Sequence, residues 1–275
     1  MISRIVLILV SVGFLAGCGS GGSSAKNAVL AAFYPLAYAA ERIGGGDYNV
    51  QNLTPPGAEP HDLELTPQEV GRIVNASVVL YLSHGFQPAV SKAVKQARGT
   101  KVDVLTGLPL RANDPHVWLD PILFARIATK LGAALHRPSS VLVADLRKLD
   151  RTYRNGLRDC KRREIVTSHA AFGYLAARYG LEQVAITGLA PESEPSPQQL
   201  AHVIAIVRRT QATTVFFETL VSPRLAKTVA HEVDAHTAVL DPIEGLTPDE
   251  QKRGDDYITL MRRNLVALRK ALACR

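Results

Sequence analysis

Residues 114–121 read DPHVWLDP, and this stretch decides how the middle of the chain is expected to fold. The first Asp-Pro pair favours an extended or turn conformation just before His116, because a residue that precedes proline is disfavoured in the helical region. The second pair, at Asp120, is a helix start: an N-cap residue followed by proline at the first helical position. The only tryptophan of the chain, Trp118, indicates that the loop packs against the protein. His116 is therefore expected on a short, fixed loop, as a core residue or as a ligand.

On both sides of this stretch, short apolar runs alternate with helical patterns, and the alternation occurs twice. Such a pattern is typical of α/β folds with parallel sheets. In the first half we expect strands at residues 28–33, 50–53, 77–82 and 102–105, and helices at 36–43, 67–75 and 87–98. In the second half we expect strands at residues 164–167, 183–187, 214–217 and 236–240, helices at 171–179, 197–209 and 223–233, and a last helix from about residue 255.

The segment between the two halves is predicted to be helical rather than a flexible linker. One helix follows Pro121 until Arg137-Pro138 interrupts it, and a second runs from about residue 139 to residue 157. The second helix would be about 25–30 Å long at its usual rise per residue. A helical connector restricts relative motion of the two halves in a way that a Gly/Ser linker does not.

The first residues indicate export. An apolar run at residues 5–15 follows one positive charge, is short for a membrane span, and precedes a Gly/Ser-rich stretch at residues 19–24. We therefore expect a signal peptide at residues 1–17 and a flexible tether at residues 18–26. The sequence LAGC, which ends at Cys18, resembles the lipobox of bacterial lipoproteins. This resemblance implies that Cys18 becomes a lipid-modified N-terminus that anchors the protein to the outer face of the cell membrane; the alternative is a plain secreted protein.

Without Cys18, two cysteines remain, Cys160 and Cys274. In an oxidising compartment the default expectation for one such pair is a structural disulfide.

The formal net charge of +7 does not indicate nucleic-acid binding. Basic residues are spread among acidic ones and lack the interleaved aromatic residues of single-strand binders. A weak affinity for anionic lipid headgroups is compatible with this composition.

Four residues stand where a ligand site of a parallel sheet would draw its side chains, beyond the carboxyl ends of strands or in proline-marked loops. They are His61, His116, His169 and Asp241. Taken singly, each histidine is better explained as a hydrogen-bonded surface residue, and Asp241 as a cap before proline. Together, three imidazoles and one carboxylate form a complete tetrahedral set for zinc.

These residues also lie in fragments that match a family. The chain resembles the metal-binding solute-binding lipoproteins of zinc and manganese ABC importers (cluster A-I type) over nearly its whole mature length, in the fragments EPHDLELTP, YLSHGFQP, DPHVWLDP, TSHAAFGYLAARYGL, LDPIEG and YITLMRRNL. The resemblance implies two (β/α)4-like lobes with parallel sheets, joined by a single long rigid helix, and a metal site in the cleft between the lobes. The implied boundaries are residues 27–137, 138–159 and 160–275.

The resemblance also implies which residues bind the metal and what the protein does. His61 and His116 of the first lobe and His169 and Asp241 of the second would be the ligands. Histidine at position 169 favours zinc, with manganese as the alternative. The protein would be a monomer that captures the metal and delivers it to an ABC permease and its ATPase, with no catalytic residues. We further expect nearby carboxylates to orient the imidazole rings, with Asp62, Glu64 and Asp120 as candidates.

Two readings from other classes stay open at this point. The protein could be a surface adhesin with a structural metal. It could also be a secreted zinc hydrolase, which needs three protein ligands, an open position for water and a general base. Glu218 and Glu244 are the candidate bases, but the sequence has no HExxH motif.

Overall fold

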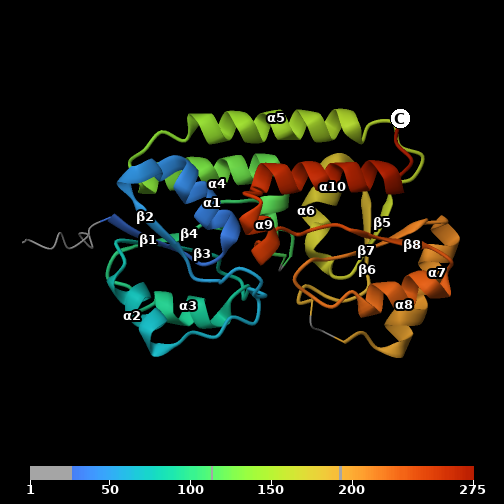
Figure 1. Ribbon diagram of the computed structural model, residues 1–275, viewed down its shortest axis with the longest axis horizontal. Helices are drawn as coiled ribbons and strands as arrows, with labels where there is room; N and C mark the ends of the chain where they lie inside the picture. The colour runs from blue at the N-terminus through green and yellow to red at the C-terminus, as the bar shows by residue number, and fades with distance from the viewer. Residues whose placement is uncertain (1–26, 113, 192–193) are drawn as a thin grey trace, which may run out of the picture.

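The computed structural model describes residues 27–112, 114–191 and 194–275 of the chain (Figure 1). The predicted signal peptide, the lipidation site Cys18 and the tether lie outside the described residues. None of the helices within the described part is long and apolar enough to cross a membrane.

The first lobe is built on a four-stranded parallel sheet in the order β2-β1-β3-β4. Helices connect the strands, and helix α2 starts at a capping box in which Thr66 and Glu69 satisfy each other's backbone N–H groups. The elements are β1 (Ala28–Ala31), α1 (Tyr34–Gly44), η2 (Gly45–Asp47), β2 (Asn49–Asn52), α2 (Pro67–Asn75), β3 (Val78–Tyr81), α3 (Pro88–Val94) and β4 (Thr100–Asp103).

Helix α3 is shorter than the predicted helix at residues 87–98. The chain turns towards β4 through Gly99, where the backbone passes very close to a neighbouring turn. A Cβ atom at this position would lie 2.2 Å from the carbonyl oxygen of Ala76. Only glycine permits this approach. The backbone N–H of Arg98 already bonds to the carbonyl of Val74 at 3.1 Å, so the chain has left the helix before it reaches Gly99.

The second lobe repeats the topology of the first, with the parallel strand order β6-β5-β7-β8. The prediction of two parallel α/β lobes is therefore confirmed. The elements are β5 (Glu164–Thr167), η4 (Ala170–Phe172), α6 (Gly173–Tyr179), β6 (Glu182–Ala185), α7 (Pro197–Thr210), β7 (Thr214–Phe217), α8 (Arg224–Glu232) and β8 (His236–Val239).

A layer of helices connects the lobes. After the short helix η3 (Val117–Leu119), α4 (Pro121–Ala134) begins at Asp120, whose carboxylate accepts hydrogen bonds from two backbone N–H groups of the first turn, as expected of an N-cap. Helix α5 (Ser140–Gly156) then runs across both lobes (Figure 1). The chain returns through α9 (Pro248–Lys252) and ends in α10 (Tyr257–Ala271).

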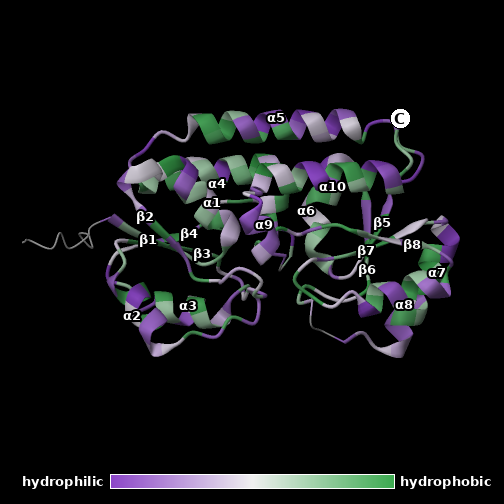
Figure 2. Ribbon diagram, in the orientation of Figure 1, coloured by the Kyte–Doolittle hydropathy of each residue, from purple (hydrophilic) through white to green (hydrophobic). Residues whose placement is uncertain are grey.

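The predicted single linking helix is only one part of this connection. Helices α4 and α10 lie along α5, between that helix and the two sheets, so α5 is the outermost element of this helical layer (Figure 1). The hydroxyl of Tyr153 on α5 donates a 2.6 Å hydrogen bond to the carbonyl of Met261 on α10. Hydrophobic and hydrophilic residues alternate along α5 and α10 (Figure 2), as expected of helices with one buried face.

Helix α9 is absent from the predicted elements, although its signal is present in the sequence. Thr247 accepts a hydrogen bond from the backbone of Glu250, whose carboxylate binds back to the backbone of Thr247, and Pro248 occupies the first helical position. This capping box is the signature of a helix start.

The larger of two hydrophobic clusters runs through both lobes, and a second, smaller one packs the sheet of the second lobe against α7 and α8. A continuous cluster of buried side chains extends from β1 through α4 and α5 to α10 and includes Leu240 at the end of β8. Trp118 donates a 2.7 Å hydrogen bond to the carbonyl of Pro242 in the second lobe, and Tyr257 stacks on Tyr38 of the first lobe at 5.7 Å. This shared packing limits how far the lobes can move apart.

A disulfide joins Cys160 to Cys274, 114 residues apart in the sequence. It ties the end of the chain to the segment that leads from α5 into the second sheet.

Candidate metal centre

Four side chains converge between the two sheets. His61, His116, His169 and Glu244 each offer one potential ligand atom, and these atoms all lie within 4.8 Å of one another. The Nε2 atoms of His116, His61 and His169 are 3.1, 3.5 and 3.6 Å from Oε1 of Glu244. Each lobe contributes two of the four residues.

The topology brings these residues together because each stands in a loop beyond the sheets. His61 lies in the loop between β2 and α2, His116 immediately precedes η3, and His169 lies between β5 and η4. In open parallel sheets such loops gather at one edge, where ligands bind. The structure therefore assembles all three histidines that the sequence singles out.

Glu244 enters the cluster through an unusual turn after β8. The preceding residue, Ile243, has a φ of 58°, a left-handed conformation that is strained for a β-branched residue. Asp241 stabilises this turn, because its carboxylate accepts a 2.7 Å hydrogen bond from the backbone N–H of Ile243. The turn directs Glu244, which is fully buried, towards the imidazoles.

The structure differs from the expected ligand set at Asp241. This residue is held away from the cluster by Asn264, which bonds to both its backbone N–H and its carbonyl, at 2.9 and 2.6 Å. Burial raises the pKa of the Asp241 carboxyl to about 8. The carboxylate that meets the three imidazoles is Glu244, three residues further along the same loop.

Two other carboxylates fix the imidazole rings. Nδ1 of His116 is 2.7 Å from Asp114, which also accepts a 2.9 Å hydrogen bond from the backbone N–H of His116. Nδ1 of His169 is 2.6 Å from Glu218, and Glu218 also accepts a hydrogen bond from the hydroxyl of Ser168. A carboxylate on one ring nitrogen sets the tautomer and points the lone pair of the other nitrogen at the centre.

The expected orienting residues lie elsewhere. Asp62 and Glu64 are exposed. Asp120 caps α4 and lies 3.2 Å from Arg178. The sequence does contain a signal for Glu218 as an orienting residue, because Glu218 directly follows β7 just as the His169 loop follows β5. Asp114, in contrast, is interpreted from the sequence only as a turn residue before proline.

The Nε2 atoms of all three histidines are buried and have no hydrogen-bond partner among the described residues, and the same is true of both carboxylate oxygens of Glu244. Buried polar atoms are normally paired, so a group of unpaired atoms that face one another indicates a missing ligand. Three nitrogen donors and one carboxylate oxygen, in a group small enough for one ion, match the tetrahedral ligand sets of zinc.

Nearby carboxylates favour the charged form of two of the buried imidazoles, His116 and His169, and burial opposes it. Burial lowers the pKa of His169, but the carboxylate of Glu218, bonded to Nδ1, and that of Glu244, 3.6 Å from Nε2, outweigh burial and raise the pKa to about 10. Burial raises the pKa of Glu244, but the three imidazoles outweigh it and hold the pKa well below its usual value.

A neighbouring acidic residue, Glu59, lies outside the converging set. One of its oxygens accepts a 3.1 Å hydrogen bond from the backbone N–H of His61. Burial, and next the charge of Glu244, raise the pKa of Glu59 to about 8. The ring of Phe86 packs against His61 at 4.5 Å and makes one wall of the site apolar.

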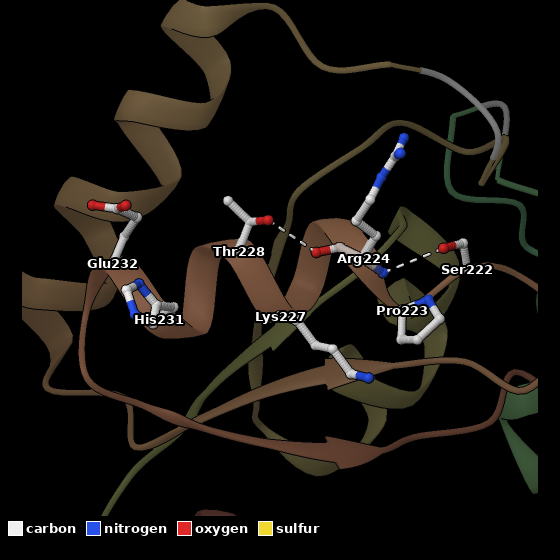
Figure 3. Close-up of a pocket in the computed structure, with 7 residues that line it drawn as sticks. All are labelled: Ser222, Pro223, Arg224, Lys227, Thr228, His231 and Glu232. Carbon is white, nitrogen blue, oxygen red and sulfur yellow. Dashed lines mark hydrogen bonds between the residues drawn. The ribbon is translucent and has the colours of Figure 1, made fainter.

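A separate pocket lies along α8 (Figure 3). Its side chains make local contacts, such as the 3.0 Å hydrogen bond from the hydroxyl of Thr228 to the carbonyl of Arg224. It contains one histidine, His231, and does not gather a set of metal ligands.

The fold and the site together define a two-lobed α/β protein with a buried metal centre between its lobes. The chain matches the family model described as zinc-uptake complex component A, periplasmic, over residues 29–271. The chain belongs to this family.

Known proteins support this assignment. The high-affinity zinc uptake system protein ZnuA of Bacillus subtilis (strain 168) is 32% identical over 308 aligned residues, which cover 97% of each chain. The zinc-binding lipoprotein AdcA of Streptococcus pneumoniae (strain ATCC BAA-255 / R6) is also 32% identical, over 97% of this chain, but this chain spans only 60% of AdcA.

Solved structures are similar as well. The Zn(II)-bound ZnuA-like domain of Streptococcus pneumoniae AdcA superposes with a TM-score of 0.77 at 31% identity, covering 90% of this chain and 99% of that domain. The laminin-binding protein Lmb of Streptococcus agalactiae, described as bifunctional with adhesin and metal-transporting activity, has a TM-score of 0.80 at 28% identity, covering 89% of this chain and 99% of Lmb.

Proposed function

We propose that this protein captures one zinc ion outside the cytoplasm and delivers it to an ABC importer. Zinc would bind to His61, His116, His169 and Glu244. The observation that carries the proposal is the convergence of three buried imidazole nitrogens without partners on a buried, unpaired carboxylate. The zinc-binding relatives favour the same ion.

Capture and release depend on both lobes, because each supplies two ligands. Full coordination requires the lobes to be close together, so binding and closure are coupled. The shared core and the layer of α4, α5 and α10 keep this movement small. Zinc is favoured over manganese because imidazole nitrogen suits zinc, whereas manganese prefers oxygen ligands.

Binding rather than catalysis fits the ligand set. Four protein ligands fill a tetrahedral site and leave no open position for an attacking water. Neither candidate base of a hydrolase is free to activate a water: Glu244 is itself one of the four proposed ligands, and Glu218 is bound to His169 and Ser168.

We further propose that Cys18 anchors the protein to the outer face of the membrane by a lipid, and that the protein works as a monomer with a permease and its ATPase. The family's periplasmic description and the lipoprotein AdcA support this placement. The relative Lmb makes adhesion a second role to be tested alongside transport.

Calorimetry tests the zinc proposal directly. The metal-free protein should bind one zinc ion per chain, and manganese should bind at least about 100-fold more weakly because three of the four donors are nitrogen. A strain without the protein should grow poorly in metal-depleted medium and recover with added zinc, whereas a pure adhesin would leave growth unchanged. Equal affinities for the two ions would contradict the assignment of zinc.

The stability of the metal-free protein and the extra stability that zinc gives should change with pH in opposite directions. The folded-state pKa of His169 is raised to about 10 from 6.5, so its contribution to stability is fully present below the lower value and is lost as the pH rises through the upper one. Glu59 and Asp241, both raised to about 8, act in the same direction. The metal-free protein should therefore unfold more easily as the pH rises.

Zinc binding instead displaces protons from the imidazoles, so the increase in melting temperature on zinc addition should grow from about pH 6 to about pH 8.5. Thermal unfolding with zinc and with a chelator checks both trends. An increase that is the same at all these pH values would show that no imidazole proton competes with the metal.

A further inference from the structure

The three imidazoles of the metal centre are not held in the same way. His116 and His169 each have a carboxylate on Nδ1, at 2.7 and 2.6 Å, which fixes the direction of the ring. His61 has no such partner: among the described residues, the only acidic side chain paired with its ring is Glu244, which lies 3.5 Å from Nε2 on the metal-facing side. A group other than a carboxylate must therefore orient this third imidazole.

Two backbone contacts hold the loop that carries His61, but neither reaches the ring. The N–H of Gly57 donates a 2.8 Å hydrogen bond to the carbonyl of Leu246, and the N–H of His61 donates a 3.1 Å hydrogen bond to Glu59. Both bonds fix the path of the backbone. The side chain of His61 can still turn about its own torsion angles unless packing holds it.

The ring of Phe86 supplies this packing. It meets the imidazole of His61 at a centroid distance of 4.5 Å and an interplanar angle of 68°, an edge-to-face arrangement. Phe86 is 1% exposed and the side chain of His61 is 9% exposed, so the contact lies in the protein interior. His116 is farther from Phe86, at 6.2 Å. The imidazole without a carboxylate is thus the one that Phe86 contacts closely.

Phe86 is itself fixed by its neighbours. Its ring packs on Phe33 at 4.7 Å and on Trp118 at 5.4 Å. The next residue, Gln87, is buried, and its amide donates a 3.1 Å hydrogen bond to the hydroxyl of Thr54 in the loop after β2. A side chain that is locked by packing on several sides can hold a ligand in a defined position. Phe86 therefore forms a rigid wall behind the imidazole.

We propose that Phe86 is the positioning residue of His61. Its ring does for this ligand what a carboxylate does for the other two imidazoles. It acts by contact alone and adds no charge, so it fixes the direction of the Nε2 lone pair without making the imidazole more basic. The role rests on the proposed zinc function, because the direction of this lone pair matters only when a metal binds at the centre.

Phe86→Leu and Phe33→Leu are the matched pair of variants that tests the role. Both rings are buried and both pack on Trp118, but of the two it is Phe86 that contacts His61. Zinc affinity, measured by calorimetry, should fall about tenfold in Phe86→Leu and stay within about twofold in Phe33→Leu. Denaturant unfolding compares what each variant loses in core packing. Phe86→Met, which keeps more of the side-chain volume, replaces Phe86→Leu if that variant does not fold.

Bound Co²⁺ in place of zinc reports whether the site stays four-coordinate. The visible absorption of Co²⁺ is strong in a tetrahedral site and weakens when water joins as a further ligand. The cobalt-loaded Phe86→Leu protein should absorb more weakly, because a loosely held His61 leaves room for water. Phe33→Leu should keep the spectrum of the unmodified chain. A loss of stability alone would not change this spectrum.

Chemical labelling tests the same contact without any metal. Diethyl pyrocarbonate modifies accessible imidazoles, and mass spectrometry of the digested protein gives the rate at His61. The rate should rise in metal-free Phe86→Leu and not in Phe33→Leu, because the first variant removes the ring that packs on His61.

The proposal is overturned if the two leucine variants change the zinc affinity, the cobalt spectrum and the labelling rate to the same extent, or if Phe86→Leu changes none of them. An unmodified chain that binds no zinc would refute the proposed function instead. The labelling rates would then still decide whether Phe86 holds His61.

Discussion

Replacing Glu244 by alanine is expected to lower the affinity for zinc at least about 100-fold, the upper range for the loss of residues that only orient metal ligands. Glu244 is the sole carboxylate among the converging atoms, and it is fully buried. Its removal takes away one of four ligands and leaves the three imidazoles without the carboxylate that their Nε2 atoms face. Isothermal titration calorimetry of the metal-free variant measures the effect.

The matched control is Asp241→Asn, three residues earlier in the same loop. Asparagine keeps an oxygen that can accept the hydrogen bond from the backbone of Ile243, so the turn is preserved. The affinity of this variant should fall less than about tenfold, since asparagine leaves the ligand set intact. If instead Asp241→Asn costs more than Glu244→Ala, then Asp241 is the ligand and the turn must rearrange when the metal binds.

Replacing Arg178 by methionine is expected to reduce the free energy of unfolding by about 3 kcal/mol, as is typical when one partner of a largely buried ion pair is removed. Arg178 on α6 lies 2.6 Å from Asp150 on α5 and 3.2 Å from Asp120, the N-cap of α4. It thereby joins the second lobe to the helix layer. Burial raises the pKa of Asp150, but the hydrogen bonds from Arg178 and Arg154 outweigh it and lower the pKa.

Arg154→Met is the control for this effect. Arg154 contacts the same carboxylate, at 3.1 Å, but its side chain is 56% exposed, against 17% for Arg178. An exposed pair four residues apart on a helix contributes less than about 0.5 kcal/mol. Denaturant unfolding of both variants provides the comparison, and equal losses would mean that Arg178 does not bridge the lobes.

The sequence is sufficient to predict the fold because several of its strands are short apolar runs, and helices such as α2, α4 and α7 begin at recognisable caps. The two parallel sheets follow from this pattern, and both are confirmed. Helix α9 is not among the predicted helices because its five residues are too few for a periodic pattern, although its capping box is present in the sequence. The layer of α4 and α10 along α5 depends on packing between segments far apart in the chain, which no local pattern reveals.

The sequence predicts only part of the metal site, for a related reason. His61, His116 and His169 stand out because histidine beyond the end of a strand is chemically distinctive. The choice between Asp241 and Glu244 depends on the left-handed conformation of Ile243 and on the bonds from Asn264, which lies 23 residues away from Asp241 in the sequence. A carboxylate directly after a strand is the more obvious candidate, and in the structure it is the one that holds the turn.

The most direct test of the central claim is a crystal structure of the zinc-loaded protein with anomalous diffraction recorded at the zinc edge. One strong peak should lie between the lobes, about 2.0–2.2 Å from the Nε2 atoms of His61, His116 and His169 and from a carboxylate oxygen of Glu244. A peak bound by Asp241 in place of Glu244, or a metal that contacts only one lobe, would contradict the account.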